Sequence, residues 1–282
     1  MNITQLLVNG YKILKENEID SYKIDTQLLL QKVLEVDKLF ILTNRSYEVT
    51  MENEKEFMSL LQLRKNKMPV KYILGHCEFM GLDFLVREGV LIPRPDTEIL
   101  VEHVLQVAKA NNAKSICDVC CGSGAIGISL SHFLGDVQVS CCDLSETAIE
   151  VTSENANRLL SQGRVKVVKS DLLHFAIEEK AKFDIIVSNP PYIKEKVIET
   201  LMEDVRNYEP YMALSGGEDG LDFYKEIITQ SLMLLNKEGV LAFEIGHDQG
   251  VEVKKLMEYS AYKNVNILQD LAGFDRVVIG NI

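Results

Sequence analysis

The chain has 282 residues, of which 46% are hydrophobic and 26% are charged, as in ordinary globular proteins. This length suits one large α/β domain with a small appendage. No run of about 18 apolar residues is present to span a membrane, and residues 1–5 lack the basic and apolar regions of a signal peptide. We therefore expect a cytoplasmic protein with no membrane partner.

The formal net charge of −12 is unevenly distributed along the chain. Residues 1–87 contain 12 Lys and Arg against 12 Asp and Glu, so the remainder carries the whole acidic excess. An acidic region repels phosphate backbones. The charge therefore disfavours tight, sequence-independent binding of nucleic acid, and no direct nucleic-acid partner is expected.

Residues 1–72 show helical periodicity and almost no strand pattern. Leu6, Leu7, Tyr11 and Leu14 fall at spacings typical of one helix face. The segment predicts a small helical bundle, which alone would have a marginal core. We expect it to recognise a partner or to pack on the rest of the chain.

Residues 73–95 predict a β-hairpin followed by a linker. The hairpin is expected at residues 76–86, where two short apolar runs flank a turn. Farther on, Pro93 and Pro95 flank Arg94 in a stiff, extended segment. A plain linker between domains and the border of a pocket both fit such a segment, and its sequence leaves the choice open.

Residues 96–282 alternate between strand and helix patterns. The predicted strands are residues 115–119, 137–142, 164–168, 183–188, 239–244, 264–268 and 275–279. The predicted helices are residues 99–110, 124–134, 146–160, 222–235 and 248–257. This alternation predicts a largely parallel sheet covered by helices on both faces. Residues 189–221 show no regular pattern, and a loop of that length inside a compact domain is usually functional.

Six cysteines raise the question of a metal or redox site. Cys117-x-x-Cys120 has suitable spacing, but a zinc site needs a second pair of this kind. Cys117 falls inside an apolar strand pattern, where a small buried thiol is ordinary. We expect no metal site, and no disulfide in a cytoplasmic chain.

A glycine-rich loop lies between a predicted strand and a predicted helix, with the sequence Asp118-Val119-Cys120-Cys121-Gly122-Ser123-Gly124. Glycines let a ligand approach the backbone closely, and the helix N-terminus offers free N–H groups. Asp143, followed by Leu144, comes directly after the next strand. A carboxylate at that place can bind both hydroxyls of a ribose.

The cofactor is not settled by the glycines alone, because Gly122-x-Gly124-x-x-Gly127 also satisfies the dinucleotide pattern of nicotinamide enzymes. Asp118 favours S-adenosylmethionine, since its carboxylate can meet the positively charged amino group of the methionine part but would repel a pyrophosphate. We therefore predict S-adenosylmethionine as the cofactor, with S-adenosylhomocysteine as the product. Cys120 to Gly124, Asp143 and Leu144 are predicted to bind it together with Asp118.

Asp171 and Leu172 follow the third predicted strand. In this sheet order Asp171 can reach the exocyclic amine of an adenine, and Leu172 can pack on the ring. The alternative for Asp171 is an ordinary helix cap or turn residue. We include both residues in the predicted cofactor site.

The strand at residues 183–188 runs into Asn189-Pro190-Pro191-Tyr192, beyond its carboxyl end, where open α/β sheets bind ligands. A planar NH₂ group is a poor nucleophile because its lone pair is delocalised. The Asn189 side-chain oxygen and the Pro190 carbonyl can accept its two N–H bonds, orient it and stabilise the developing positive charge. Tyr192 can stack on the planar group. We predict all four residues as substrate-binding, with Asn189, Pro190 and Tyr192 catalytic, and Asn189 also beside the cofactor.

The whole sequence resembles the HemK/PrmC-type protein-(glutamine-N5) methyltransferases that act on peptide chain release factors. The segments that carry this resemblance are Pro69–Gly75, Leu91–Glu98, the glycine-rich loop, Asn189–Tyr192, Tyr208–Pro210, Ala213-Leu214, Gly216–Leu221, Glu244–Gly246 and Asp270–Gly273. Adenine DNA methyltransferases and guanine RNA methyltransferases share only the Asn-Pro-Pro-Tyr motif. Leu91–Glu98, Gly216–Leu221 and the helical N-terminal segment are far more specific to the family.

The resemblance implies a Rossmann-like class I methyltransferase sheet of seven strands, the last antiparallel, in residues 96–282. It implies that the substrate is the glutamine of the Gly-Gly-Gln loop of bacterial release factors, and that the helical domain at residues 1–72 helps to grip the factor. It assigns the cofactor to Cys120–Gly124, Asp143, Leu172 and Asn189. Cys120 departs from the family, which has a glycine there, and a positive φ at this position would make its Cβ costly. We expect a tolerated small residue at the strand end, with donor affinity the property most open to change.

Three other functions are weighed against this one. The chain could methylate a glutamine of a ribosomal protein, or an amino group of a nucleic acid, which the acidic catalytic region disfavours. It could also be a catalytically silent binding module, which the intact Asn189 and Asp143 argue against. We expect a monomer.

Overall fold

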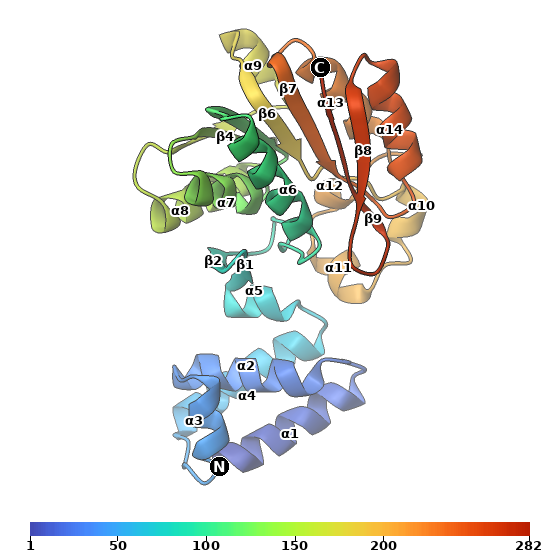
Figure 1. Cartoon of the computed structure of the whole chain (residues 1–282). Helices are drawn as coiled ribbons and strands as arrows, with labels where there is room; N and C mark the ends of the chain where they lie inside the picture. Colours follow the sequence, from blue (N-terminus) through green and yellow to red (C-terminus); the bar gives the residue numbers. More distant parts are fainter. The chain divides into compact units, whose positions relative to one another are not determined.

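The computed structural model describes all 282 residues as two compact units. The N-terminal unit comprises Met1–His76 together with Met202–Tyr208, and the sheet unit comprises Cys77–Leu201 together with Glu209–Ile282. Figure 1 draws the helices of residues 1–76 in blue and cyan, and the sheet-containing part from green to red. None of the helices combines the length and apolar character needed to cross a membrane.

The N-terminal unit is a bundle of helices. Its elements are α1 (Ile3–Glu16), α2 (Tyr22–Leu34), α3 (Lys38–Thr43), α4 (Met51–Lys65), α5 (Val70–Leu74) and α11 (Glu203–Tyr208). Asn2 begins α1 with a capping box, in which its side chain accepts from the Gln5 N–H at 2.9 Å and the Gln5 side chain accepts from the Asn2 N–H. Leu6, Leu29 and Phe57 are fully buried in the shared apolar core.

The bundle includes more of the chain than the predicted helical domain at residues 1–72. Leu74 of α5 packs in the bundle core. Helix α11 also belongs to this unit, and the Tyr208 hydroxyl donates to the Asn66 carbonyl at 2.6 Å. Because α11 lies more than 120 residues farther along the chain, no local sequence pattern assigns it to the bundle.

The sheet unit alternates strands and helices, as predicted. Its elements are β1 (His76–Phe79, from Cys77 on), β2 (Leu82–Leu85), α6 (Thr97–Ala110), β3 (Ser115–Val119), α7 (Ala125–Leu134), β4 (Gln138–Asp143), α8 (Glu146–Leu159), β5 (Val165–Lys169), α9 (His174–Glu179), β6 (Phe183–Ser188), α10 (Glu195–Ile198), α12 (Tyr211–Leu214), α13 (Asp222–Ser231), β7 (Leu235–Glu244), α14 (Gly250–Tyr259), β8 (Lys263–Gln269) and β9 (Asp275–Asn281). Strands β1 and β2 form the expected hairpin.

The other seven strands form one sheet in the order β5-β4-β3-β6-β7-β9-β8. Strands β3 to β7 pair in parallel, and the last strand, β9, is antiparallel to both of its neighbours. The predicted sheet of seven strands with an antiparallel last strand is therefore confirmed. The order reverses between β3 and β6, and a crevice at such a switch point is where open α/β sheets bind ligands.

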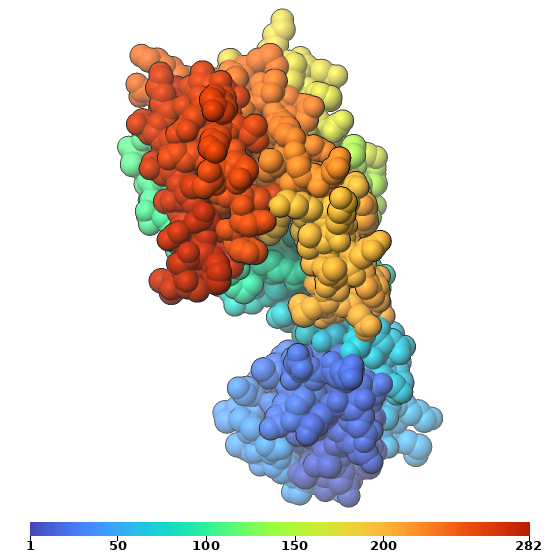
Figure 2. All heavy atoms as spheres, turned by 90° about the vertical axis from the view of Figure 1, so that its right-hand side faces the viewer, coloured from blue at the N-terminus to red at the C-terminus, as the bar shows by residue number.

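Successive residues of the central strands point to opposite faces of the sheet. Ile116 and Ile185 face the cluster that contains α6 and α7, whereas Cys117 and Ile186 face the cluster that contains α9, α13 and α14. Helices α13 and α14 contact each other on this second face. Figure 2 shows the C-terminal part of the chain, coloured orange to red, on the surface turned toward the viewer. Both faces are thus covered, as the apolar strand patterns predict.

The register of the sheet places several chain segments at one edge. Val119 of β3 lies level with Ser188 of β6, which in turn lies level with Phe243 of β7. The residues that follow these three strand positions therefore meet at the carboxyl edge. They include the glycine-rich loop, Asn189 and Glu244.

The region between β6 and β7 differs in detail from the predicted elements. The irregular stretch at residues 189–221 contains three short helices, α10, α11 and α12. The predicted helix at residues 222–235 ends at Ser231, because Leu235 instead pairs with Phe183 as the start of β7. The apolar pair Leu234 and Leu235 fits a helix face as well as a buried strand, so its pattern does not decide between them.

Candidate active site

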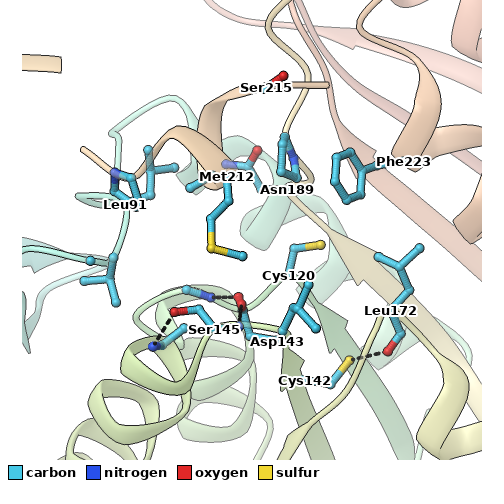
Figure 3. Close-up of a pocket in the computed structure, with 18 of the residues that line it drawn as sticks. Leu91, Cys120, Cys142, Asp143, Ser145, Leu172, Asn189, Met212, Ser215 and Phe223 are labelled. Carbon is cyan, nitrogen blue, oxygen red and sulfur yellow. Dashed lines mark hydrogen bonds between the residues drawn. The ribbon is translucent and has the colours of Figure 1, made fainter. Parts of the chain in front are cut away.

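A cavity of about 330 Å³ lies beyond the carboxyl ends of the central strands. It is lined by the loop after β3, the ends of β4 and β6, the residues after β5, the segment 89–91 and the segment 210–215. Figure 3 shows Asp143 and Ser145 at one side of this cavity, Asn189 and Phe223 at the other, and Cys120 between them. The volume is within the usual range for small-ligand sites.

The glycine-rich loop is held by hydrogen bonds from the next strand and helix. The Gly122 N–H donates to Asp143 Oδ2 at 2.9 Å, and the Thr152 hydroxyl donates to the Gly122 carbonyl at 3.0 Å. Gly124 has φ of +79°, and a Cβ at this position would come within 2.8 Å of Thr152. The loop therefore needs glycine at Gly124 for both conformation and space.

Cys120 adopts a left-handed conformation with φ of 59°. The positive φ considered for this position is therefore present, and a Cβ in this region costs about 1–2 kcal/mol; the effect on donor affinity stays a prediction. Its side chain lines the cavity, where burial raises the pKa of the thiol well above its usual value. Leu172, another cavity residue, has φ of 46°. Strained residues of this kind cluster at functional sites.

Asp143 lines the cavity and is held by backbone N–H groups. Its Oδ1 accepts from Ser145 N–H and its Oδ2 from Gly122 N–H, both at 2.9 Å. Burial raises the pKa of this carboxyl, although these hydrogen bonds act in the opposite direction. Leu144 and Asp171 line the same cavity.

Asp118 does not line the cavity, contrary to the position expected from the glycine pattern. Its side chain is fully buried, and its Oδ2 accepts from the Gly127 N–H of α7 at 2.8 Å. Burial raises the pKa of Asp118 to about 7. Alternation along β3 explains the position, because Asp118 shares the face of Ile116, which packs against α7.

The Asn-Pro-Pro-Tyr segment is divided between the cavity and its support. Asn189 and Pro191 line the cavity, whereas Pro190 and Tyr192 do not. The Tyr192 ring packs against the apolar core, and its hydroxyl donates to Glu244 Oε1 at 3.4 Å. Burial, followed by the Glu244 charge, raises the pKa of Tyr192, so its hydroxyl keeps its proton.

A smaller cavity of about 50 Å³ adjoins the large one and shares Leu91, Cys120, Gly122 and Asn189 with it. Cys121 and Ser123 line this smaller cavity. Its other wall is formed by Leu91–Thr97, which we call the proline strap. Of the two interpretations of this segment, the border of a pocket is therefore the one that the structure supports.

Several residues of the site are not among the predicted site residues. Arg94 of the proline strap donates to Glu209 at 2.5 Å, and Glu209 is buried. Met212 and Phe223 extend the wall of the large cavity. Glu209 and Met212 lie in the irregular stretch at residues 189–221, whose length indicates function but not which side chains supply it.

No group of three or more His, Cys, Asp or Glu side chains is placed to hold a metal ion. All six cysteines are free thiols. Burial also contributes to raising the pKa of Cys141 and Cys142, after hydrogen bonds to neighbouring cysteines. These thiols are therefore protonated, apolar packing residues of the sheet.

Comparison with known proteins identifies the family. A model of the PrmC N-terminal domain matches residues 5–75, and a model of the methyltransferase small domain matches residues 95–207. The chain is 55% identical to the release factor glutamine methyltransferase of Clostridium botulinum, over 99% of this chain and 98% of the relative. It is 36% identical to that of Bacillus anthracis, over 100% of both chains. The chain belongs to the release factor glutamine methyltransferase family.

Solved structures agree on the fold of the catalytic part. A methyltransferase from Pyrococcus furiosus has a TM-score of 0.53 at 18% identity, over 72% of this chain and 90% of that chain. A 16S rRNA methyltransferase from T. thermophilus, solved with AdoMet and guanosine, has a TM-score of 0.52 at 16% identity, over 73% and 49%. The predicted family and class I methyltransferase fold are confirmed. As a member of this family, the chain is an enzyme whose methyl donor is S-adenosylmethionine.

Proposed function

We propose that this enzyme methylates the side-chain nitrogen, N5, of the glutamine in the Gly-Gly-Gln motif of peptide chain release factors. The observation that carries the proposal is the position of Asn189, which shares one cavity with the glycine-rich loop and Asp143. A methyl donor and an amide acceptor can therefore meet at its walls. The family of the chain gives the class of substrate.

The residues present fit the donor. Asp143 offers a carboxylate to the ribose hydroxyls, Leu172 offers an apolar wall to the adenine, and Cys120 and Gly122 line the same cavity beside them. When bound, S-adenosylmethionine supplies an electrophilic methyl group on a sulfonium. Asp118 interacts with the donor only through the helix and loop that it holds, since its side chain is buried.

The chain's part in the reaction is to orient the amide and to stabilise charge. We assign the two N–H bonds of the substrate to the Asn189 side-chain oxygen and the Pro190 carbonyl. These acceptors direct the nitrogen lone pair toward the methyl group and stabilise the positive charge as it develops. Tyr192 is assigned to anchor this segment through its hydroxyl bond to Glu244, since its ring packs in the core.

The test uses methyl-labelled S-adenosylmethionine with four acceptors: a purified bacterial release factor, its Gly-Gly-Gln variant with Gln→Ala, ribosomes, and protein-free RNA. We expect label only in the intact factor, with mass spectrometry placing one methyl group on the glutamine. Labelling of ribosomes instead would show a ribosomal-protein substrate. Labelling of RNA alone would overturn the proposal.

A further inference from the structure

Glu244 is a buried carboxyl group at the edge of the sheet where the Asn-Pro-Pro-Tyr segment begins. It ends β7 directly after Phe243, which pairs with Ser188, the residue before Asn189. Its exposed fraction is 3%, which leaves little solvent to stabilise a charge. Its Oε1 accepts one hydrogen bond, whereas its buried Oε2 has no direct hydrogen-bond partner, so the donors around this carboxyl group matter for its charge.

The two donors come from opposite sides of the site. The Tyr192 hydroxyl donates to Glu244 Oε1 at 3.4 Å. The Thr97 hydroxyl, at the start of α6 and the end of the proline strap, acts on this carboxyl from the other side as the donor that most opposes the rise in its pKa. Thr97 itself is buried. One carboxyl group therefore contacts both the last residue of the Asn-Pro-Pro-Tyr segment and a residue of the strap.

Thr97 in turn contacts Asn189. The Asn189 Nδ2 donates to Thr97 Oγ1 at 3.4 Å. This distance is at the long end of hydrogen bonding, so the contact can adjust around a bound amide. The chain of contacts runs from Asn189 through Thr97 to Glu244 and on to Tyr192, and we call it the Glu244 network.

The direction of the hydrogen bonds in this network is fixed by chemistry. Once Glu244 is ionised, its carboxylate only accepts, so the single hydroxyl proton of Thr97 then points to Glu244. The Thr97 oxygen is then left as an acceptor, and the part of Asn189 that meets it must be the NH₂ group. The Asn189 side-chain oxygen is consequently left for the cavity.

From this geometry we propose that the Glu244 network sets the orientation of the Asn189 amide, so that its oxygen and not its NH₂ group faces the substrate. Thr97 and Glu244 are positioning residues, because they act through Asn189. The inference rests on the proposed role of Asn189 as an acceptor of the substrate N–H. An Asn189 amide turned the other way would present a donor to a donor and repel the substrate.

The direct test is Thr97→Val, which keeps the shape but removes the hydroxyl, beside Thr97→Ser, which keeps the hydroxyl. We expect kcat for methylation of the release factor to fall about tenfold in Thr97→Val, and to recover to within about threefold of wild type in Thr97→Ser. The donor Kd, measured by calorimetry, should stay unchanged. Thr229→Val, on an exposed turn of α13, removes a hydroxyl that bonds only the Lys225 carbonyl and serves as the matched control.

A second arm tests the polarity of the network through Glu244. Thr97 and Tyr192 donate to this carboxyl, Asp96 and Arg276 act on it by charge, and the Tyr224 hydroxyl donates to its backbone carbonyl. Burial raises the pKa of Glu244 to about 7. We expect kcat of the wild type to rise through that pH, and Glu244→Gln to have a lower kcat at pH 8 with the rise abolished.

The outcomes separate this inference from the proposed function. A Thr97→Val enzyme with normal kcat, beside an inactive Asn189→Ala enzyme, would overturn the network and leave the function intact. If Thr97→Val bound the donor more weakly but kept a normal kcat, Thr97 would be a donor-binding residue, and this result would also overturn the network. A Glu244→Gln enzyme whose kcat still rises through pH 7 would overturn the network as well. A wild-type enzyme that does not methylate the release factor contradicts the proposed function itself.

Discussion

The two sides of the cavity are built in different ways. The donor side is assembled from segments close to one another in the sequence: the glycine-rich loop after β3 and Asp143 at the end of β4, which bonds Gly122 directly. The acceptor side takes Asn189 from the end of β6, Thr97 from the proline strap and Glu244 from β7. Thr97 thus lies 92 residues before Asn189 in the sequence, and Glu244 lies 55 residues after it.

This difference separates what a motif specifies from what the fold must supply. On the donor side, one turn of chain sets the backbone that meets the ligand, so strain and hydrogen bonds within the loop decide affinity. On the acceptor side, the reactive group is one amide whose orientation depends on distant partners. Changes on the donor side should therefore appear in binding, and changes on the acceptor side in turnover.

The largest expected effect is on the acceptor side. Asn189→Ala removes one acceptor of the substrate N–H, and we expect kcat to fall by about 10²-fold or more, by analogy with the loss of a transition-state hydrogen-bond partner. Circular dichroism should show an unchanged fold. Near-normal turnover in a folded variant would contradict the role of Asn189 and the contrast between the two sides.

The next largest effect is on how the free energy of unfolding depends on pH. It compares the buried carboxyl group of Asp118 on the donor side with that of Glu244 on the acceptor side. Burial raises the pKa of each to about 7, above their ordinary values of 3.8 and 4.5. Between those values and pH 7 the folded chain binds more protons than the unfolded chain, so stability falls as pH rises. For one such group the fall is about 2 kcal/mol between pH 5 and pH 7.

Urea unfolding at several pH values measures the slope of the free energy of unfolding against pH. Asp118→Asn and Glu244→Gln should each make this slope smaller. Asp136→Asn, which changes an exposed carboxyl group, is the control and should leave the slope unchanged. Equal slopes in all four proteins would show that neither buried carboxyl carries the expected proton.

The sequence predicts the two sides of the site unequally, for physical reasons. The sheet, the glycine-rich loop and the positions of Asp143 and Asn189 follow from periodicity and from the rule that parallel strands end at one edge. The partners of Asn189 do not, because pairing Thr97 with Glu244 depends on strand order and register rather than on local pattern. Asp118 could have been placed correctly, since alternation along β3 already sets it on the α7 face of the sheet.

Asp143 is the carboxylate of the donor side. Asp143→Ala removes the carboxylate from the cavity and releases the Gly122 and Ser145 N–H groups that it holds. Because bonds to a charged group contribute about 1.5 kcal/mol or more, we expect the donor Kd to rise about tenfold or more. Calorimetry measures it, with Asp136→Ala as the control. At saturating donor, kcat should change far less than in Asn189→Ala.

The smallest effect tests strain within the donor side. Cys120 holds a φ of 59° that a glycine adopts freely, so Cys120→Gly should raise the free energy of unfolding by about 1 kcal/mol. The greater flexibility of glycine in the unfolded chain reduces that gain, whereas Cys120→Ala keeps the strain and should give none. Because the thiol lines both cavities, its removal also widens the donor side. Donor Kd should therefore change in Cys120→Gly while the pH rise in kcat, which belongs to the acceptor side, stays as in wild type.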